Sequence, residues 1–160
     1  MNHAEHVRGW VGGKPETPCG RGSRLGETAK QRKWIPAQVE KYGITSIADI
    51  GAGDLNWVSR IDIGCDYAAY DLIPRVEGVQ KLDLLTDELP KADCMMALWV
   101  LNHLSPADQK TAIDKLKSAG RFLIMTYDKR MEPCTNLEYV EKTVLRRDRG
   151  VDFEIRLIKC

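Results

Sequence analysis

A glycine-rich turn between carboxylates is the part of the sequence best suited to hold a ligand. The segment Asp49-Ile50-Gly51-Ala52-Gly53-Asp54 follows an apolar run and precedes a short helical stretch at 55–60. Glycines at such a turn let the backbone approach a ligand closely. A dinucleotide site would need a third glycine where this chain has Asn56 beside Trp57. The two acids and the missing glycine favour a ligand with an ammonium group over a pyrophosphate.

Three further side chains with useful chemistry follow apolar runs. Asp71 comes directly after the run at 67–70, Asp83 follows the run at 79–82, and His103 lies just past the run at 92–100. Ligands of open α/β sheets bind at the carboxyl ends of the strands, so we expect all three residues on that rim. His103 is the candidate general base. The alternatives stay open: aspartate after a strand is a common turn residue, and a histidine here can pack or cap a helix.

The elements that must position these residues are short apolar runs, at 44–50, 67–70, 79–82, 92–100 and 121–126. Their nearly continuous hydrophobicity is typical of strands buried on both faces, which predicts a parallel sheet. Apolar and polar residues then alternate at 151–158 after the turn at 148–150, with 139–147 before it, which predicts an antiparallel hairpin.

Two helices are predicted around this sheet. One spans 27–42, with Gly43 as its stop. The other spans 105–119, with Ser105 as N-cap and Gly120 as terminator. The connections at 72–78 and 85–91 are too short for a full crossover helix, so one face of the sheet must carry abbreviated helices, and we expect the first helix to cover it.

Composition restricts the class of protein. The chain has 160 residues, 43% of them hydrophobic and 29% charged, and a net charge of +1, as in a globular protein. No apolar stretch approaches the roughly 20 residues of a membrane span, and the N-terminus is no secretory signal, so we expect a cytoplasmic protein without a membrane partner. Five scattered cysteines without a C-x-x-C pair predict reduced thiols and no metal site.

The segment Asp49-Ile50-Gly51-Ala52-Gly53-Asp54 is similar to motif I of class I S-adenosylmethionine-dependent methyltransferases, and the order of elements over 44–160 matches theirs. The chain also resembles an uncharacterised bacterial and phage branch of that family, through Cys19-Gly20-Arg21-Gly22-Ser23 with Thr28 and through Gly53-Asp54-Leu55-Asn56-Trp57. The resemblance implies a Rossmann-like domain with a mostly parallel, seven-stranded sheet and a C-terminal antiparallel hairpin. It divides the chain into a glycine-rich loop and helix at 1–43, a candidate lid, and a cofactor-binding domain at 44–160.

The resemblance also implies S-adenosylmethionine (SAM) as cofactor, S-adenosylhomocysteine (SAH) as product, and a set of contacts. Asp49 would face the amino end of SAM, Asp71 the ribose hydroxyls and Asp83 the adenine amino group. The remaining implied contacts are Ser23, Gly51, Ala52, Gly53, Trp57, Leu72, Leu84, Leu98 and Trp99.

The acceptor of the methyl group is open at this stage. An Asp/Asn-Pro-Pro-Tyr motif is missing, and Pro133-Cys134 follows the fifth strand rather than the fourth, where cytosine-C5 enzymes place their nucleophile. We therefore predict a small-molecule or nucleotide-like acceptor, recognised by the N-terminal loop and 127–136. The alternatives are a nucleic-acid methyltransferase that uses the basic N-terminal segment, and a non-catalytic SAM-binding protein. The oligomeric state is not indicated.

Overall fold

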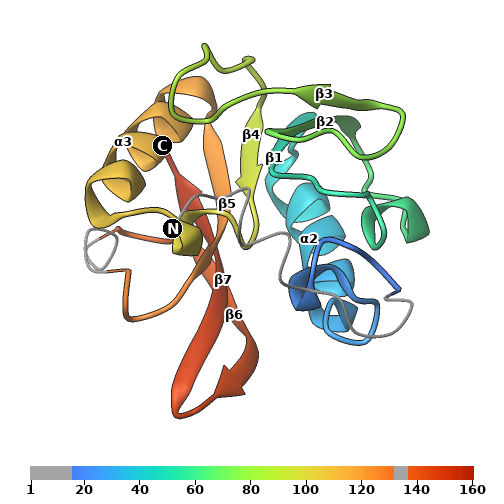
Figure 1. Cartoon of the computed structure of the whole chain (residues 1–160), viewed down its shortest axis with the longest axis vertical. Helices are drawn as coiled ribbons and strands as arrows, with labels where there is room; N and C mark the ends of the chain where they lie inside the picture. Colours follow the sequence, from blue (N-terminus) through green and yellow to red (C-terminus); the bar gives the residue numbers. More distant parts are fainter. Residues whose placement is uncertain (1–15, 132–136) are drawn as a thin grey trace.

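The computed structural model describes residues 16–131 and 137–160, and its centre is one seven-stranded sheet (Figure 1). The strands lie in the order β3-β2-β1-β4-β5-β7-β6. Their bounds are β1 Ser46–Ile50, β2 Asp66–Asp71, β3 Val79–Lys81, β4 Cys94–Ala97, β5 Phe122–Tyr127, β6 Glu141–Asp148 and β7 Val151–Lys159. The first five strands pair in parallel, and β7 pairs antiparallel with both β5 and β6. This confirms the predicted sheet and its terminal hairpin.

The two long helices pack on opposite faces of the sheet. Helix α2 (Ala29–Tyr42) buries Ile35 and Val39 in a core with β-strand residues such as Met96 and Ile124. Helix α3 (Pro106–Ala119) buries Ile113 and other residues in a separate core with alternate strand residues. Successive strand side chains point to opposite faces, so each strand supplies both cores.

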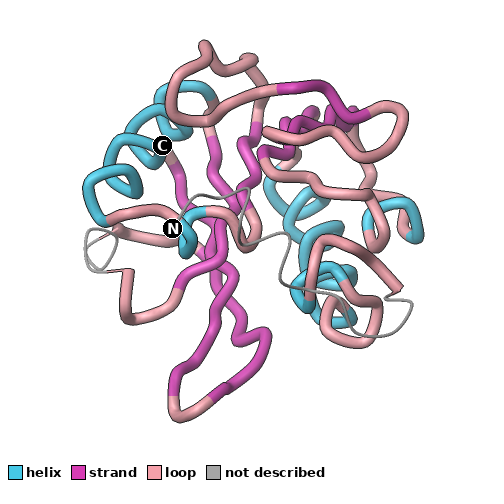
Figure 2. Tube along the Cα trace, in the orientation of Figure 1, coloured by secondary structure: helices cyan, strands magenta, loops and turns pink. Residues whose placement is uncertain are grey.

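The connections on the β1–β3 side are abbreviated, as predicted. After β1 the chain forms only the 3-10 turn η2 (Val58–Arg60), and loops without a helix join β2 to β3 and β3 to β4 (Figure 2). Two further 3-10 turns, η1 (Arg21–Ser23) and η3 (Leu101–His103), lie close to the strand ends. No helix in the described part of the chain is long and apolar enough to span a membrane.

The predicted caps of α3 and the stop of α2 are present. The Ser105 hydroxyl accepts a hydrogen bond from the Asp108 backbone N–H at 3.2 Å. Gly43 adopts a left-handed φ of 59° and returns its N–H to the last turn of α2. Helix α2 begins two residues later than predicted, at Ala29 rather than residue 27, and continues through Pro36.

The fourth strand is shorter than the apolar run at 92–100 predicts. β4 ends at Ala97, and Trp99 has a left-handed φ of 59°, which is unusual for a bulky residue. The Trp99 N–H donates to the Thr126 hydroxyl on β5 at 3.1 Å instead of continuing the strand ladder. Hydrophobicity alone could not reveal this bend, because residues 98–100 remain apolar where they line a cavity.

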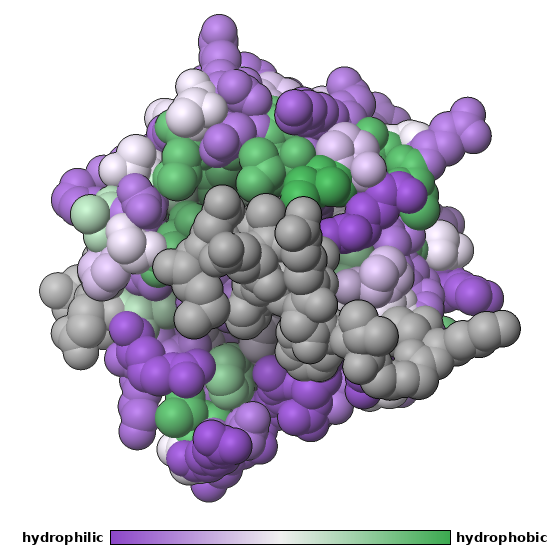
Figure 3. Space-filling model, viewed as in Figure 1, coloured by the Kyte–Doolittle hydropathy of each residue, from purple (hydrophilic) through white to green (hydrophobic). Residues whose placement is uncertain are grey.

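The β6–β7 hairpin projects beyond the rest of the sheet (Figure 1). Its tip is the turn at Arg149 and Gly150, which have φ values of 47° and 75°. On the face drawn in Figure 3, the projecting hairpin is mostly hydrophilic, whereas apolar side chains gather nearer the centre of the molecule. The buried residues Ile155, Leu157 and Ile158 lie in the part of β7 that pairs with β5.

Candidate functional site

A cavity of about 650 Å³ lies at the carboxyl ends of the parallel strands. This position is the one at which open α/β sheets bind ligands, and the volume lies within the range of small-molecule sites, roughly 300–1,000 Å³. All thirteen predicted site residues line it: Ser23, Asp49, Gly51, Ala52, Gly53, Trp57, Asp71, Leu72, Asp83, Leu84, Leu98, Trp99 and His103. The structure thus brings the predicted residues together, while their individual roles remain predictions.

The glycine turn after β1 is held in a conformation that requires glycine. Gly51 and Gly53 have φ values of 84° and 65°, which side chains rarely tolerate. The N–H groups of Gly51 and Ala52 both donate to the Tyr70 carbonyl on β2. A Cβ on Gly51 would lie 2.2 Å from Val100 Cγ2. The turn therefore packs its backbone directly against the segment that follows β4.

Asp71 is oriented by backbone donors on two sides. Its Oδ2 accepts the Gly53 N–H at 2.9 Å, and its Oδ1 accepts the Ile73 N–H at 3.0 Å. Each carboxylate oxygen keeps a second lone pair, so Asp71 can still accept two hydroxyl donors. Asp83 is similarly part of a turn, since its Oδ1 accepts the Leu85 N–H at 2.9 Å. These two aspartates can therefore stabilise their turns and bind a ligand at the same time.

Asp49 is a buried carboxyl at the end of β1, only 4% exposed. Its Oδ2 accepts the Tyr67 hydroxyl at 2.5 Å. Burial raises the pKa of Asp49 to about 7, although the hydrogen bond from Tyr67 opposes that rise. A cation arriving in the cavity would favour the charged form of this carboxyl and lower its pKa again.

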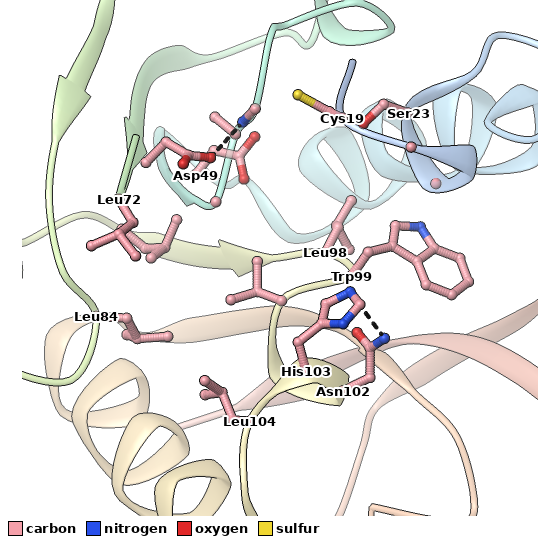
Figure 4. Close-up of a pocket in the computed structure, with 18 of the residues that line it drawn as sticks. Cys19, Ser23, Asp49, Leu72, Leu84, Leu98, Trp99, Asn102, His103 and Leu104 are labelled. Atoms are coloured by element: carbon pink, nitrogen blue, oxygen red, sulfur yellow. Dashed lines mark hydrogen bonds between the residues drawn. The ribbon is translucent and has the colours of Figure 1, made fainter. Parts of the chain in front are cut away.

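Two sides of the cavity are distinct in Figure 4: Leu72 and Leu84 lie on one side, Trp99 on the other, and Leu98 between them. The exposed His103 lies on the Trp99 side, with its Nε2 3.5 Å from the Asn102 Nδ2. Leu72 and Leu84 directly follow Asp71 and Asp83 in the chain, and the histidine lies away from these two leucines.

The N-terminal segment covers part of the cavity. Residues 18–23, including η1, belong to its lining. Asn56 Nδ2 donates to the Ser23 carbonyl at 2.9 Å and to Glu16 Oε1 at 2.7 Å, which ties this segment to the turn after β1. Burial raises the pKa of the Cys19 thiol in this segment to about 11, so Cys19 is a neutral thiol at pH 7.

Three further residues line the cavity that were not named individually from the sequence. Arg130 follows β5, Arg146 belongs to β6, and Phe153 to β7, and all three line the cavity. Arg130 belongs to the segment at 127–136 that the sequence predicted for acceptor recognition. Arg146 and Phe153 read as alternating residues of a hairpin, and that pattern does not reveal which end of the sheet they approach. Residues 132–136, including Cys134 and part of the predicted acceptor segment, lie outside the described chain.

Three basic residues of the N-terminal segment, which the nucleic-acid alternative would use to hold phosphates, form contacts within the protein. Arg21 binds Glu27 at 2.7 Å, Lys30 donates to the Val144 carbonyl at 3.0 Å, and Arg32 donates to the Leu25 carbonyl at 3.0 Å. Arg8 and Lys14 lie outside the described residues. Among residues 16–131 and 137–160, no cluster of three histidine, cysteine or acidic side chains could hold a metal ion.

Comparison with known proteins gives matches in structure but not in sequence. No protein-family model matches the chain, and no curated protein matches it. The structure is similar to magnesium protoporphyrin IX methyltransferase from Synechocystis PCC 6803, solved with bound SAM, with a TM-score of 0.60 and 12% identity over 84% of this chain and 81% of that one.

Two further similar structures are also those of methyltransferases. A SAM-dependent methyltransferase from Leishmania major has a TM-score of 0.63 and 16% identity, over 97% of this chain and 80% of that chain. Human N-acetylserotonin methyltransferase has a TM-score of 0.55 and 10% identity, over 82% of this chain and only 52% of that longer chain. Together with the strand order and the position of the cavity, these similarities show that the chain has the class I fold of SAM-dependent methyltransferases.

Proposed function

We propose that this protein binds SAM in the cavity and transfers its methyl group to an acceptor bound beside it. The observation that carries the proposal is the contact between the glycine turn and Asp71. The Gly53 and Ile73 N–H groups fix the Asp71 carboxylate, and each of its oxygens keeps a lone pair that can accept a hydroxyl group of a ligand. When bound, SAM supplies a methyl group on a positively charged sulfur. The neighbours solved with SAM and SAH support this cofactor and this product.

The residues present fit such a cofactor. Asp71 would bind the ribose, and the part of the cavity lined by Leu72, Leu84 and Asp83 would bind the adenine. Asp49 would face the ammonium group. Burial disfavours the charged form of this carboxyl, and a nearby cation would stabilise that form. Residues 18–23 would exclude water on the covered side.

Methyl transfer depends mainly on positioning, because the acceptor must approach the methyl group in line. The protein can also remove the proton of the acceptor. His103 lines the cavity on the Trp99 side, and its solvent-exposed ring can pass that proton to water. We therefore propose His103 as the general base.

The cofactor proposal is tested by calorimetric titration of the protein with SAH, with NAD as a negative control. Replacing Asp71 by Ala removes charge-assisted hydrogen bonds that contribute about 1.5–3 kcal/mol, so SAH affinity should fall roughly 10- to 150-fold. Asp66→Ala is the matched control, because Asp66 lies at the opposite, exposed end of β2. A change below about twofold for Asp71→Ala would reject the role of Asp71, and no SAH binding by the parent protein would reject the cofactor.

The base proposal predicts a separation of binding from turnover. His103→Gln should lower kcat by about 10²- to 10⁴-fold once an acceptor is known, because proton removal contributes that much in general base catalysis. SAH affinity should stay within about twofold, since His103 lies away from the Leu72–Leu84 side. If kcat falls equally at all pH values and SAH affinity falls with it, His103 has a structural role instead.

A further inference from the structure

The cavity is divided by charge along the strand order. The half formed by β3, β2 and β1 contributes the carboxylates of Asp83, Asp71 and Asp49. The half formed by β4, β5, β7 and β6 contributes the guanidinium groups of Arg130 and Arg146 together with two aromatic rings. One charge of the opposite sign occurs in each half, Arg75 after β2 and Asp148 at the end of β6.

Arg146 packs beside both aromatic rings of the second half, whose centroids are 5.4 Å apart. Its Cζ is 4.7 Å from the ring centroid of Trp99 and 4.9 Å from that of Phe153. Its Nη1 forms an ion pair with Glu27 at 3.5 Å, and Glu27 is not part of the cavity lining. Within residues 16–131 and 137–160, the buried Nε of Arg146 and the buried Nε1 of Trp99 have no hydrogen-bond acceptor. Such unmatched donors are costly, typically about 1–3 kcal/mol each, so an oxyanion reaching them would be stabilised.

Arg130 is held rigidly at the rim of the same half. Its Nε and Nη2 donate to both oxygens of Asp128, at 2.7 and 3.0 Å. Asp128 is 1% exposed and lies behind Arg130, outside the cavity lining, whereas the Arg130 side chain is 62% exposed. A planar guanidinium fixed in this way loses little entropy when it binds a carboxylate or phosphate.

The two guanidinium groups approach one ring. The Cζ of Arg130 is 5.2 Å and that of Arg146 is 4.9 Å from the Phe153 centroid. Their counter-ions Asp128 and Glu27 lie behind them rather than in the cavity. An anion close to either guanidinium group is favoured, and it is favoured more where water is partly excluded.

We propose that the half of the cavity formed by β4–β7 is the acceptor subsite, and that it selects small acceptors bearing a carboxylate or phosphate group bound by Arg130 and Arg146. This inference rests on the proposed methyltransferase function. It assigns the acidic half of the cavity to a cofactor that carries a sulfonium and an ammonium group, and the basic half to an anionic partner. The shared chemistry of the acceptor is an oxyanion next to a planar or apolar group that contacts Phe153.

The test is a titration of the ¹⁵N-labelled protein, saturated with SAH, with benzoate, phenyl phosphate and benzyl alcohol. The reporter is the Trp99 indole N–H signal, assigned by its loss in Trp99→Phe. We expect a saturable shift with benzoate, with phenyl phosphate or with both, and none with the neutral alcohol. Binding of only one anion identifies the acceptor group as carboxylate or as phosphate.

Variants separate the roles of the arginines. Arg130→Gln should weaken anion binding at least tenfold, because it removes a charge-assisted contact. Arg146→Gln should do the same, and if it fails to fold, the exposed Arg130 still decides the question. Arg147→Gln is the control: Arg147 neighbours Arg146 on β6, binds Asp152 and does not line the cavity. Asp148→Asn should strengthen anion binding, because it removes the carboxylate of this half.

The outcomes distinguish this inference from the function on which it rests. Equal binding of benzyl alcohol and benzoate, or anion affinity within twofold of the parent in Arg130→Gln, overturns the oxyanion subsite. Retained SAH binding in the same sample leaves the cofactor proposal intact. Absence of SAH binding overturns the proposed function, and the same titration without SAH then still decides whether the basic half binds anions.

Discussion

Asp49 should make the free energy of unfolding depend on pH. Its pKa of about 7 exceeds the ordinary value of 3.8 because the carboxyl is buried. The folded protein therefore holds a proton that the unfolded chain has already released, and the free energy of unfolding should fall as pH rises from about 4 to about 7. Since one pKa unit corresponds to about 1.4 kcal/mol, the effect amounts to several kcal/mol.

Asp49→Asn should remove this dependence, because the amide cannot ionise. Urea unfolding at pH 5 and pH 8 should show a smaller loss of stability for the variant than for the parent. SAH affinity of the parent should also rise between pH 6 and pH 8, as Asp49 becomes charged and can bind the ammonium group, while the affinity of Asp49→Asn should be flat. Parallel pH profiles for the two proteins would contradict the raised pKa.

At the scale of elements, the turn after β1 depends on a close contact with the segment after β4. Gly51 and Gly78 have nearly equal φ values, 84° and 87°. A Cβ on Gly51 would collide with Val100, whereas one on Gly78 would meet no atom within 4 Å. Alanine variants at the two positions therefore separate the cost of backbone strain from the cost of steric collision.

Gly78→Ala should cost about 1–2 kcal/mol of unfolding free energy, the cost of a left-handed conformation with a side chain. Gly51→Ala should cost a further 1–3 kcal/mol, as overpacking does, and should weaken SAH binding because the turn must shift. Denaturant unfolding and SAH titration of both variants check this. Equal stability losses would mean that the contact between the turn and Val100 is unimportant.

At the scale of the whole molecule, the central strands β1, β4 and β5 are buried on both faces of the sheet. Leu123 and Ile124 are neighbours on β5 and both are 0% exposed, yet they belong to different cores, that of α3 and that of α2. The sheet between the two helices is therefore the shared wall of both cores.

Leu123→Ala and Ile124→Ala should each cost about 2–5 kcal/mol, because each leaves a cavity in a packed core. Val144→Ala is the control, since Val144 on the edge strand β6 is 38% exposed and should lose less than about 1 kcal/mol. The urea concentration at the midpoint of unfolding reports the stability of all three variants. A small loss for only one of the β5 variants would mean that one face of the sheet is not a true core.

Local signals in the sequence predicted much of this protein. The cap at Ser105, the stop at Gly43 and the alternation at 151–158 each depend on neighbours within a few residues, and the structure has all three. The glycine turn and Asp71 could be placed at one end of the sheet because parallel strands align their carboxyl ends. The length of β4 could not be predicted, since the turn at Trp99 depends on a hydrogen bond to Thr126.

What the sequence by itself determined is therefore the kind of fold and the acidic half of the site, because both follow from periodicity and from short-range spacing. Only the tertiary structure decided that Arg146 packs against both Trp99 and Phe153, and that Arg130 is fixed by Asp128 near them. Trp99 follows β4 and Arg146 belongs to β6, and β5 and β7 lie between these two strands in the sheet. Their contact depends on long-range packing, which no local pattern of residues records.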